Sequence, residues 1–468
     1  MKINNKYLFW PFVSNGFSNF HEITDQSQIK NKKTFLIHGN GRSYSHCCLN
    51  DDKPLLSMRK INKIILFNKN TGELRAQAGI TIKEIHDVVT KYFWVVNISP
   101  GTQYVTLGGC VANDIHGKNY HSAGSFIQSV NYIKIIRSDG KEYLCSRKNN
   151  KSLFFASFGG LGLTGMISEV SINLKKVRSL FMDVQKLPFD SMQEFVKLSK
   201  KFEDQYEYSV GWMDCVSKYM GRGFIFNSNF LKTNKNETNK NLKRKINLRY
   251  FPLIPVFNKF SIPVFNYLYY LINKLRKNKF IQHYVKNLYP LDAVLGWNRL
   301  YGTSGFFQLQ FLIPVNNLQS FEVDFFNLLK KYNLTSFLVV LKLFTNHKKS
   351  GMLSFPKNGL SVAVDFRNNS HTPDLIRDLQ LLIKGYKGRT YLAKDAFIDK
   401  KMFQNFYPEF NTFKKFMDVN LSSNLKRKIF PRPLQRPPTG PQRSCGGRQS
   451  IFEPSWPFSE CRGNDQVH

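Results

Sequence analysis

Residues 100–130 constrain this chain more than any other stretch, because they combine glycines, small residues and two histidines with almost no helical periodicity. Glycine lacks a Cβ, so it adopts positive φ without steric cost and lets backbone amides approach a ligand. Successive amides turned inward form a concave site that suits a phosphate or pyrophosphate. The stretch therefore predicts a backbone cradle for an anionic cofactor, built on Gly101, Gly108, Gly109, Gly117 and Gly124.

A second glycine motif follows a short apolar strand signal within residues 35–50, FLIHGNGRSYSHCCLN. A strand followed by glycines is typical of dinucleotide-binding folds. The third glycine and the amphipathic helix of a Rossmann fingerprint are missing, however, so the motif argues only weakly for that fold.

Together, GNGRSY and the later PGTQYVTLGGCVANDIHGKN resemble the FAD-binding domain of the vanillyl-alcohol-oxidase-type flavoenzymes, a PCMH-type domain. The motifs DIHGKN, GFFQLQF, LSFP and YLAKD are similar to one family among them, the decaprenylphosphoryl-β-D-ribose 2′-oxidases. The resemblance extends from about residue 10 to about residue 428.

The resemblance implies an α+β fold of two domains, in which a substrate domain built on an antiparallel sheet is inserted into the FAD-binding domain. We expect the FAD-binding domain over residues 1–177, the substrate domain over 178–385, and a return to the FAD-binding domain over 386–430. Residues 431–468 contain no lysine and are rich in Pro, Arg, Gly and Ser, which predicts a disordered, non-homologous tail.

Short apolar runs between turn residues predict strands in the first domain, and residues 81–92 predict an amphipathic helix with Thr81 as N-cap. Ser138-Asp139-Gly140 predicts a hairpin. Further strands at 210–216, 309–313, 337–343 and 360–366 are expected to share a second sheet, beside a helix over 191–202. Near the end, a helical stripe of phenylalanines is expected to pack in the core; it consists of Phe403, Phe406, Phe410 and Phe413.

The formal net charge of +36 would attract nucleic acid, an anionic membrane surface or a phosphate-bearing substrate. The lysines are dispersed and no zinc-finger or RNA-binding signature is present, so a nucleic-acid-binding protein stays an alternative and no specific nucleic acid is expected. The seven cysteines are odd in number and lack paired metal spacing, which favours reduced structural thiols and no metal site.

Residues 231–289 differ from the rest of the chain, since a polar, basic run is followed by a stretch dense in aromatic and aliphatic residues. Pro252, Pro255 and Pro263 forbid one continuous helix. The stretch is either a membrane-surface element or a subdomain that buries its aromatics. No apolar run is long enough to span a bilayer and no secretory signal is evident, so we expect a cytoplasmic protein, peripheral at the membrane surface.

The resemblance assigns FAD as the cofactor, bound without a covalent link. Some relatives tether the flavin through a histidine where this chain has Arg42, which cannot form that bond; His116 is the alternative tether. The residues implied in FAD binding are Gly39, Asn40, Gly41, Arg42, Ser43, Tyr44, Ser45, Gly101, Thr106, Leu107, Gly108, Gly109, Asn113, Asp114, Ile115, His116, Gly117, Ile167 and Tyr391.

The resemblance also implies the reaction: oxidation of the 2′-hydroxyl of a polyprenyl-phosphate-linked pentose, with hydride transfer to flavin N5. The chain would be the oxidase half of an epimerase in cell wall arabinan biosynthesis, beside an NAD(P)-dependent reductase. Lys394, His116 and Lys118 are the implied catalytic residues. The implied substrate residues, besides Lys394, are Trp212, Tyr301, Gln308, Gln310, Ser361 and Ala363. A sugar-lactone or alditol oxidase is the alternative.

Two positions depart from the family pattern. Ser45 replaces the last glycine of GRSYG, which puts the local loop geometry in doubt if that position requires positive φ. Ala363 stands where inhibitor-sensitive members carry a cysteine, so we expect no covalent capture there and no loss of turnover.

Overall fold

The computed structural model describes residues 2–4, 16–216, 219–233, 246–248, 252, 254–334, 336–345, 348 and 350–430. The predicted tail at 431–468 and most of the basic run that opens the 231–289 stretch lie outside the described residues. The domain boundaries at residues 177 and 385 stay a prediction, because Met1–Pro431 form a single unit.

A four-stranded sheet in the order β1-β2-β4-β3 carries the first glycine loop. Its strands are β1 (Lys2–Asn4), β2 (Phe17–Glu22), β3 (Leu36–His38) and β4 (Pro54–Ser57). The parallel pairing of β3 with β4 places Ile37 opposite Leu56. The chain leaves this sheet at Gly39, so the glycine loop begins where β3 ends.

A second, five-stranded sheet has the order β5-β6-β10-β8-β9. Its strands are β5 (Ile64–Phe67), β6 (Glu73–Gln77), β8 (Val130–Ile136), β9 (Glu142–Ser146) and β10 (Met166–Asn173). The predicted hairpin is confirmed, since β8 and β9 pair antiparallel around Ser138-Asp139-Gly140. The predicted cap is confirmed too: Thr81 and Glu84 form a capping box at the start of α2 (Ile82–Val89).

The glycine-rich stretch contains two short helices, although its sequence shows almost no helical periodicity. They are α3 (Leu107–Ala112) and α4 (Tyr120–Ala123). Thr106 caps α3, because its Oγ1 accepts a hydrogen bond from the Gly109 amide at 3.2 Å. Helices of four to six residues are too short to show an amphipathic period.

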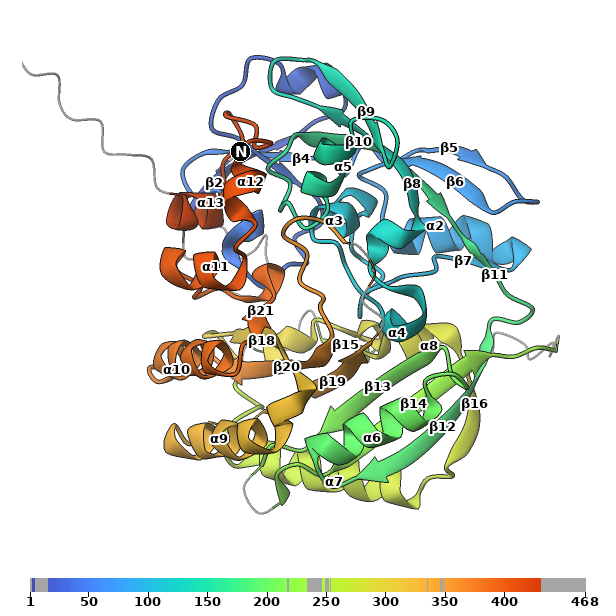
Figure 1. Cartoon of the computed structure of the whole chain (residues 1–468), viewed down its shortest axis with the longest axis vertical. Coiled ribbons are helices and arrows are strands. Elements are labelled where there is room, and N and C mark those ends of the chain that lie inside the picture. Colours follow the sequence, from blue (N-terminus) through green and yellow to red (C-terminus); the bar gives the residue numbers. More distant parts are fainter. Residues whose placement is uncertain are drawn as a thin grey trace, which may run out of the picture. The chain divides into compact units, whose positions relative to one another are not determined.

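An eight-stranded sheet in the order β16-β12-β14-β13-β19-β20-β18-β21 fills the lower half of Figure 1. The predicted strands at 210–216, 309–313, 337–343 and 360–366 all belong to it, which confirms that they share one sheet. Its strands are β12 (Phe181–Phe189), β13 (Tyr208–Met213), β14 (Gly223–Phe230), β16 (Lys279–His283), β18 (Phe306–Ile313), β19 (Val339–Phe344), β20 (Gly359–Arg367) and β21 (Arg389–Thr390).

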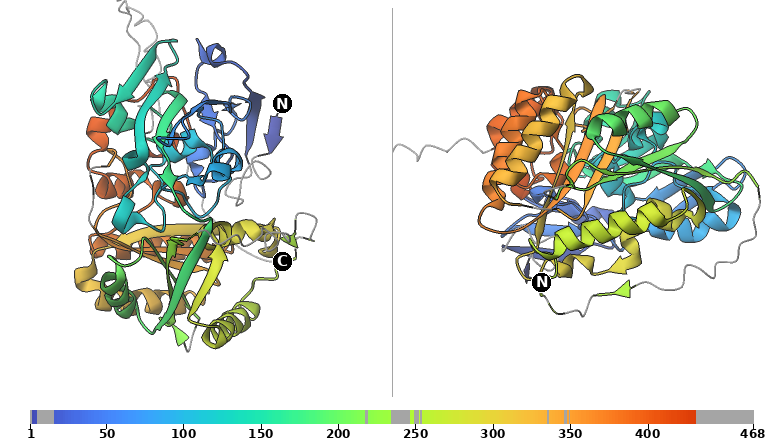
Figure 2. Two further views of the ribbon diagram at one scale, coloured as in Figure 1. Left: turned by 90° about the vertical axis from the view of Figure 1, so that its right-hand side faces the viewer. Right: turned by 90° about the horizontal axis from the view of Figure 1, so that it is seen from below.

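Helices cover the two faces of this sheet unequally. One face packs under α6 (Met192–Phe202), α9 (Leu318–Lys331) and α10 (Thr372–Gly385), and α7 (Ser261–Leu275) runs across the opposite side (Figure 2). Phe195, Phe321 and Leu375 join the alternate sheet residues Phe311 and Leu341 in the largest hydrophobic cluster. Ring contacts hold α7, with Trp212 4.6 Å from Tyr269 between centroids.

The C-terminal helices lie against the first part of the chain. They are α11 (Lys400–Phe406), α12 (Phe410–Lys414) and α13 (Asn424–Ile429). The Phe35 amide donates to Asn420 O at 3.1 Å, and the Asn424 amide donates to Leu49 O at 2.8 Å. The predicted phenylalanine stripe is buried, although it is divided between α11 and α12 rather than carried by one helix.

Among the helices that the structure describes, none combines the length and apolar content needed to cross a bilayer.

Candidate active site

One cavity of about 890 Å³ lies between the two glycine loops and the eight-stranded sheet. Its lining includes residues 39–44 of the first loop, residues 99–102 of the second, and side chains from β13, β18, β19 and β20. The two glycine stretches, far apart in the sequence, therefore face one space, as the sequence predicts. A cavity of this size is in the range that holds a cofactor or a drug-sized ligand.

The first loop presents free backbone donors to this cavity. The amides of Gly39, Asn40 and Gly41 make no hydrogen bond within the described part of the chain. Gly41 adopts positive φ at 57°. At Gly39 a Cβ would lie 2.3 Å from Thr106 Oγ1, so the two loops touch only because this residue is glycine. Three consecutive amides without a partner among the described residues, in a loop that lines the cavity, suit an anion.

The glycines of the second loop differ from the prediction in backbone conformation. Of its five glycines, only Gly124 has positive φ, so Gly101, Gly108, Gly109 and Gly117 are not required for that reason. Gly108 instead permits close packing, because a Cβ there would lie 3.0 Å from the Ala78 Cβ. Gly101, Thr106, Gly108, Gly109, Asn113 and Ile115 line the cavity, as do Ile167 and Tyr391.

Five residues predicted to bind FAD do not line the cavity: Ser45, Leu107, Asp114, Gly117 and His116, which is described below. Leu107 is buried in the core, and Asp114 accepts hydrogen bonds from Ser125 Oγ and the Ile127 amide, so it stabilises the turn that follows α3. A Cβ at Gly117 would strike Asn119 Oδ1 at 2.4 Å. Ser45 caps a 3-10 turn with φ −129°, an extended conformation open to any residue, so its departure from the family glycine introduces no backbone strain.

The floor of the cavity is a row of residues that face each other across the sheet. Gln310 pairs with Ala363, Ala363 with Val340, and Val340 with Trp212. Because side chains alternate between the faces of a strand, Gln308 and Ser361 point the same way. All six line the cavity.

Lys394 enters the cavity from the 3-10 turn Leu392–Lys394, directly after β21. Its Nζ lies 5.6 Å from the centroid of the Tyr44 ring. Burial lowers the pKa of Lys394 to about 8, and attraction to Asp365 opposes that shift. Asp365 is itself fully enclosed and accepts a hydrogen bond from Gln308 Nε2, and burial raises its pKa to about 7.

His116 lies behind the floor and does not line the cavity. Its Nε2 is 2.8 Å from Gln310 Nε2, an amide nitrogen that can only donate, so the ring accepts there and is neutral. Burial lowers the pKa of His116 well below its usual value, and Lys342 and Lys394 lower it further. Two lining residues connect His116 to the cavity: the Tyr391 ring, 5.4 Å away between centroids, and Gln310, which also donates to Ser361 Oγ at 2.8 Å.

Lys118, Lys286 and Lys342 also line the cavity. Lys118, a predicted catalytic residue, donates from Nζ to Asn287 O, and burial lowers its pKa to about 8. Lys342 was not predicted; it lies on β19 opposite Ser361, and burial together with Lys394 and Lys118 lowers its pKa to about 7. A lysine in the otherwise apolar run VVLKLF was the signal that could have identified it.

Tyr301 does not wall the cavity as predicted. It is stacked on Phe306 with centroids 4.4 Å apart, inside a cluster that includes Trp297. Trp297, and not Tyr301, lines the cavity. Trp212 lines the cavity as predicted. Trp212 Nε1 donates to Phe337 O at 3.1 Å, which fixes the indole plane.

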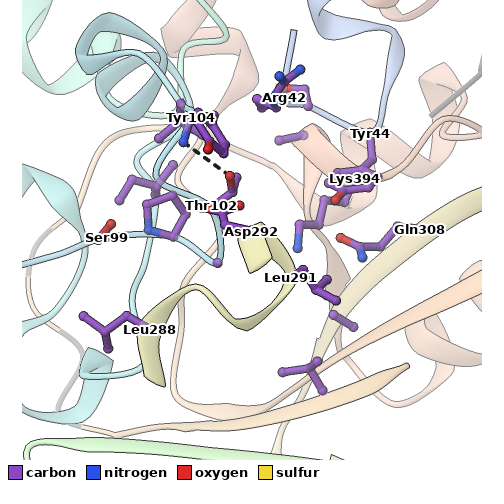
Figure 3. Close-up of a pocket in the computed structure, with 18 of the residues that line it drawn as sticks. Arg42, Tyr44, Ser99, Thr102, Tyr104, Leu288, Leu291, Asp292, Gln308 and Lys394 are labelled. Atoms are coloured by element: carbon purple, nitrogen blue, oxygen red, sulfur yellow. Dashed lines mark hydrogen bonds between the residues drawn. The ribbon is translucent and has the colours of Figure 1, made fainter. Parts of the chain in front are cut away.

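Leu291 and Asp292 lie between two parts of the cavity lining (Figure 3). Figure 3 shows Lys394, Tyr44 and Gln308 on one side, the loop with Ser99, Thr102 and Tyr104 on the other, and Leu291 and Asp292 between them. Asp292 Oδ2 accepts a hydrogen bond from the Gln103 amide at 2.9 Å. Ser99 Oγ lies 2.6 Å from Tyr289 Oη.

The described residues fit FAD. The unpaired amides of the first loop suit a pyrophosphate, and Asn113 offers a buried Oδ1 that has no partner within the described part of the chain. Arg42 belongs to the same loop and also lines the cavity, and a guanidinium suits a phosphate group. No cluster of three metal-binding side chains occurs among residues whose placement is described.

Comparisons with known proteins agree with this fit. Residues 28–146 match the family model of the FAD binding domain. The chain is 29% identical to decaprenylphosphoryl-beta-D-ribose oxidase of Mycolicibacterium smegmatis, over 80% of this chain and 83% of that protein. It is 23% identical to L-gulonolactone oxidase of Mus musculus, over 39% and 41% of the two chains. It is 25% identical to D-arabinono-1,4-lactone oxidase of Debaryomyces hansenii, over 41% and 34%. These matches confirm FAD as the cofactor.

Proposed function

Because this chain belongs to the FAD-dependent oxidoreductases that carry a PCMH-type FAD-binding domain and act on CH–OH groups, we propose that it oxidises the 2′-hydroxyl of a pentose linked through phosphate to a polyprenyl lipid. The observation that supports this substrate is the continuity of the cavity. A single space runs from the amides of the glycine loop past Lys394 to apolar residues of α7, including Phe265, Tyr269 and Ile272.

Lys394 is the residue we assign to the substrate hydroxyl. When bound, FAD supplies the hydride acceptor at flavin N5. With a pKa near 8, Lys394 is partly neutral near physiological pH and can accept the hydroxyl proton as the hydride leaves the carbon. Gln308 and Gln310 offer amide groups on the floor that orient the sugar.

The α7 helix supports a lipid substrate, because it exposes an apolar stripe on its outer side. Val264, Leu268, Leu271 and Leu275 recur at helical spacing and are 59%, 49%, 37% and 79% exposed. Phe260 at the helix start is 74% exposed. The same helix lines the cavity with other residues, so an apolar tail leaving the cavity meets a surface of matching character.

We assign this stripe to the surface of an anionic membrane. Lys259, Lys274, Arg276, Lys277 and Lys279 flank it and suit anionic headgroups. An enzyme docked in this way would meet a lipid-linked substrate without extracting its tail. This proposal selects the membrane-surface interpretation of residues 231–289.

A reductase would act next. Oxidation of the 2′ carbon leaves a ketone, and addition of a hydride to its opposite face inverts the centre. We therefore place an NAD(P)-dependent reductase beside this oxidase, and the pair would act as an epimerase.

The reaction is tested with the FAD-loaded protein mixed anaerobically with farnesylphosphoryl-β-D-ribose or with L-gulono-1,4-lactone. Loss of the visible flavin absorbance reports reduction. We expect the phosphate-linked pentose to reduce the flavin about tenfold faster or more at equal concentration. Equal or faster reduction by the lactone would instead support a sugar-lactone oxidase, the activity of two of the similar proteins.

Membrane binding is tested by co-sedimentation with vesicles that contain phosphatidylglycerol. The variant Leu268→Glu with Leu275→Glu should lose most of its binding, since both charges would enter the apolar layer. Leu381→Glu on α10, at a residue that is 58% exposed, is the matched control and should bind as the unchanged chain does. Retained binding by the double variant would exclude α7 as the contact.

A further inference from the structure

The cavity carries an excess of positive charge that FAD-binding residues do not account for. Besides Arg42 at the loop, its lining includes Lys118, Arg276, Lys286, Lys342 and Lys394. Asp292 is the one carboxylate in the lining among the described residues, and it accepts the Gln103 amide. Like charges gathered in a partly enclosed space are unfavourable unless an anion joins them.

The three central lysines differ in how their charges are compensated. Lys118 donates to Asn287 O, and Lys394 is attracted to Asp365 and lies near the face of the Tyr44 ring. Lys342 forms no side-chain hydrogen bond and no ion pair with any residue that the structure describes. It also bears the repulsion of both other lysines, which contributes to its lowered pKa.

A hydroxyl donor accompanies Lys342. Ser361 lies directly opposite it on β20 and lines the cavity. Ser361 Oγ already accepts the Gln310 amide at 2.8 Å, so its own proton is available to a ligand. An ammonium beside a hydroxyl is a donor pair that suits a phosphate oxygen.

We propose that Lys342, with Lys118 and Ser361, forms a subsite for the phosphodiester of the substrate. This inference rests on the proposed function, and it assigns the substrate hydroxyl and the substrate phosphate to different lysines. Lys394 acts on the hydroxyl, whereas Lys342 binds the anion that joins sugar to lipid. A free sugar lactone lacks this group, so the subsite also sets the class of substrate.

The experiment compares Lys342→Met and Lys342→Arg in the FAD-loaded full chain, with Lys330→Met as the control. Lys330 is exposed on α9 and away from the cavity lining. Flavin reduction by farnesylphosphoryl-β-D-ribose gives the substrate affinity and the limiting rate. We expect Lys342→Met to weaken affinity about tenfold or more while the limiting rate changes less than about threefold, because the contact holds substrate equally before and during the reaction. Lys342→Arg should retain most of the affinity.

A second measurement separates this inference from the proposed reaction. Octyl phosphate, a probe without a sugar, should perturb the visible flavin spectrum of the unchanged chain and of Lys330→Met, and should do so only at about tenfold higher concentration with Lys342→Met. If the pentose fails to reduce the flavin but the probe still distinguishes the variants, the reaction is wrong and the subsite stands. Equal probe and substrate affinity in Lys342→Met and the unchanged chain, at equal flavin content, would overturn the subsite.

Discussion

The two faces of the eight-stranded sheet come from the same strands and have opposite characters. On β18, Phe307, Leu309, Phe311 and Ile313 face the helices of the core, whereas Gln308 and Gln310 face the cavity. On β20 and β19 the same alternation places Ala363, Ser361 and Lys342 toward the cavity. Because side chains alternate along a strand, each of these strands has one set of residues in the core and another set in the cavity.

The largest effect is expected from a substitution on the core face of the sheet, and it is an effect on stability. Phe311 is fully buried, with Phe321 and Phe325 at centroid distances of 5.6 and 5.9 Å. Phe311→Ala should lower the free energy of unfolding by about 3–5 kcal/mol, since it leaves a cavity among large side chains. Urea denaturation monitored by circular dichroism measures the loss. A change below about 1 kcal/mol would contradict the assignment of this face to the core.

The next test acts on the cavity side. Lys394→Met should slow flavin reduction by about 10²–10⁴-fold, because the proton acceptor is removed. Unfolding free energy should not fall, as the variant replaces a buried charge with an apolar chain of similar length. Stopped-flow absorbance with Lys330→Met as control gives the rates. A rate within a few fold of the unchanged chain would remove Lys394 from the chemistry.

A smaller effect is expected on the pKa of Lys394, on the cavity face of the sheet. The groups around Lys394 are Asp365, Tyr44, Lys342 and the neutral His116. Asp365 holds the pKa of Lys394 up, so Asp365→Asn should lower it. Because the neutral amine accepts the proton, the flavin-reduction rate rises with pH, and its midpoint near pH 8 should move to lower pH in the variant. An unchanged midpoint would show that Asp365 does not act on Lys394.

The smallest effect is expected at Ala363, on the cavity floor opposite Gln310. Ala363→Cys adds one sulfur atom at a position that lines the cavity and removes no contact. Turnover should therefore change by less than about twofold. Steady-state kinetics with the reducing substrate measures it. A large loss would mean that the floor is packed more tightly against the substrate than its lining indicates.

Much of the fold follows from local patterns. The strands of the large sheet, the 138–140 hairpin and the Thr81 cap depend on alternation, turn residues and one side chain, all readable along the chain. The short helices α3 and α4 do not, because six and four residues are too few to show an amphipathic period.

Site residues that belong to sequence motifs could be predicted, whereas residues that are placed by the register of strand pairing could not. The glycine loops, Lys118, Lys394 and the two glutamines reach one cavity, as expected. Tyr301 was wrongly placed in the cavity wall and Lys342 was missed, because the position of each depends on strand pairing or on packing between distant residues. One sequence does not reveal that Lys342 lies opposite Ser361 on a neighbouring strand.

The anchoring of α7 has a consequence for handling the protein. Asn266 Nδ2 donates to Asp214 Oδ1 at 3.0 Å and to Ser336 O at 3.1 Å, and Lys186 Nζ donates to Arg276 O at 2.9 Å behind the helix end. With its polar side chains tied inside, the helix cannot roll to hide its leucines. In dilute aqueous buffer these leucines favour self-association that strengthens with concentration and salt, and a mild detergent should suppress it.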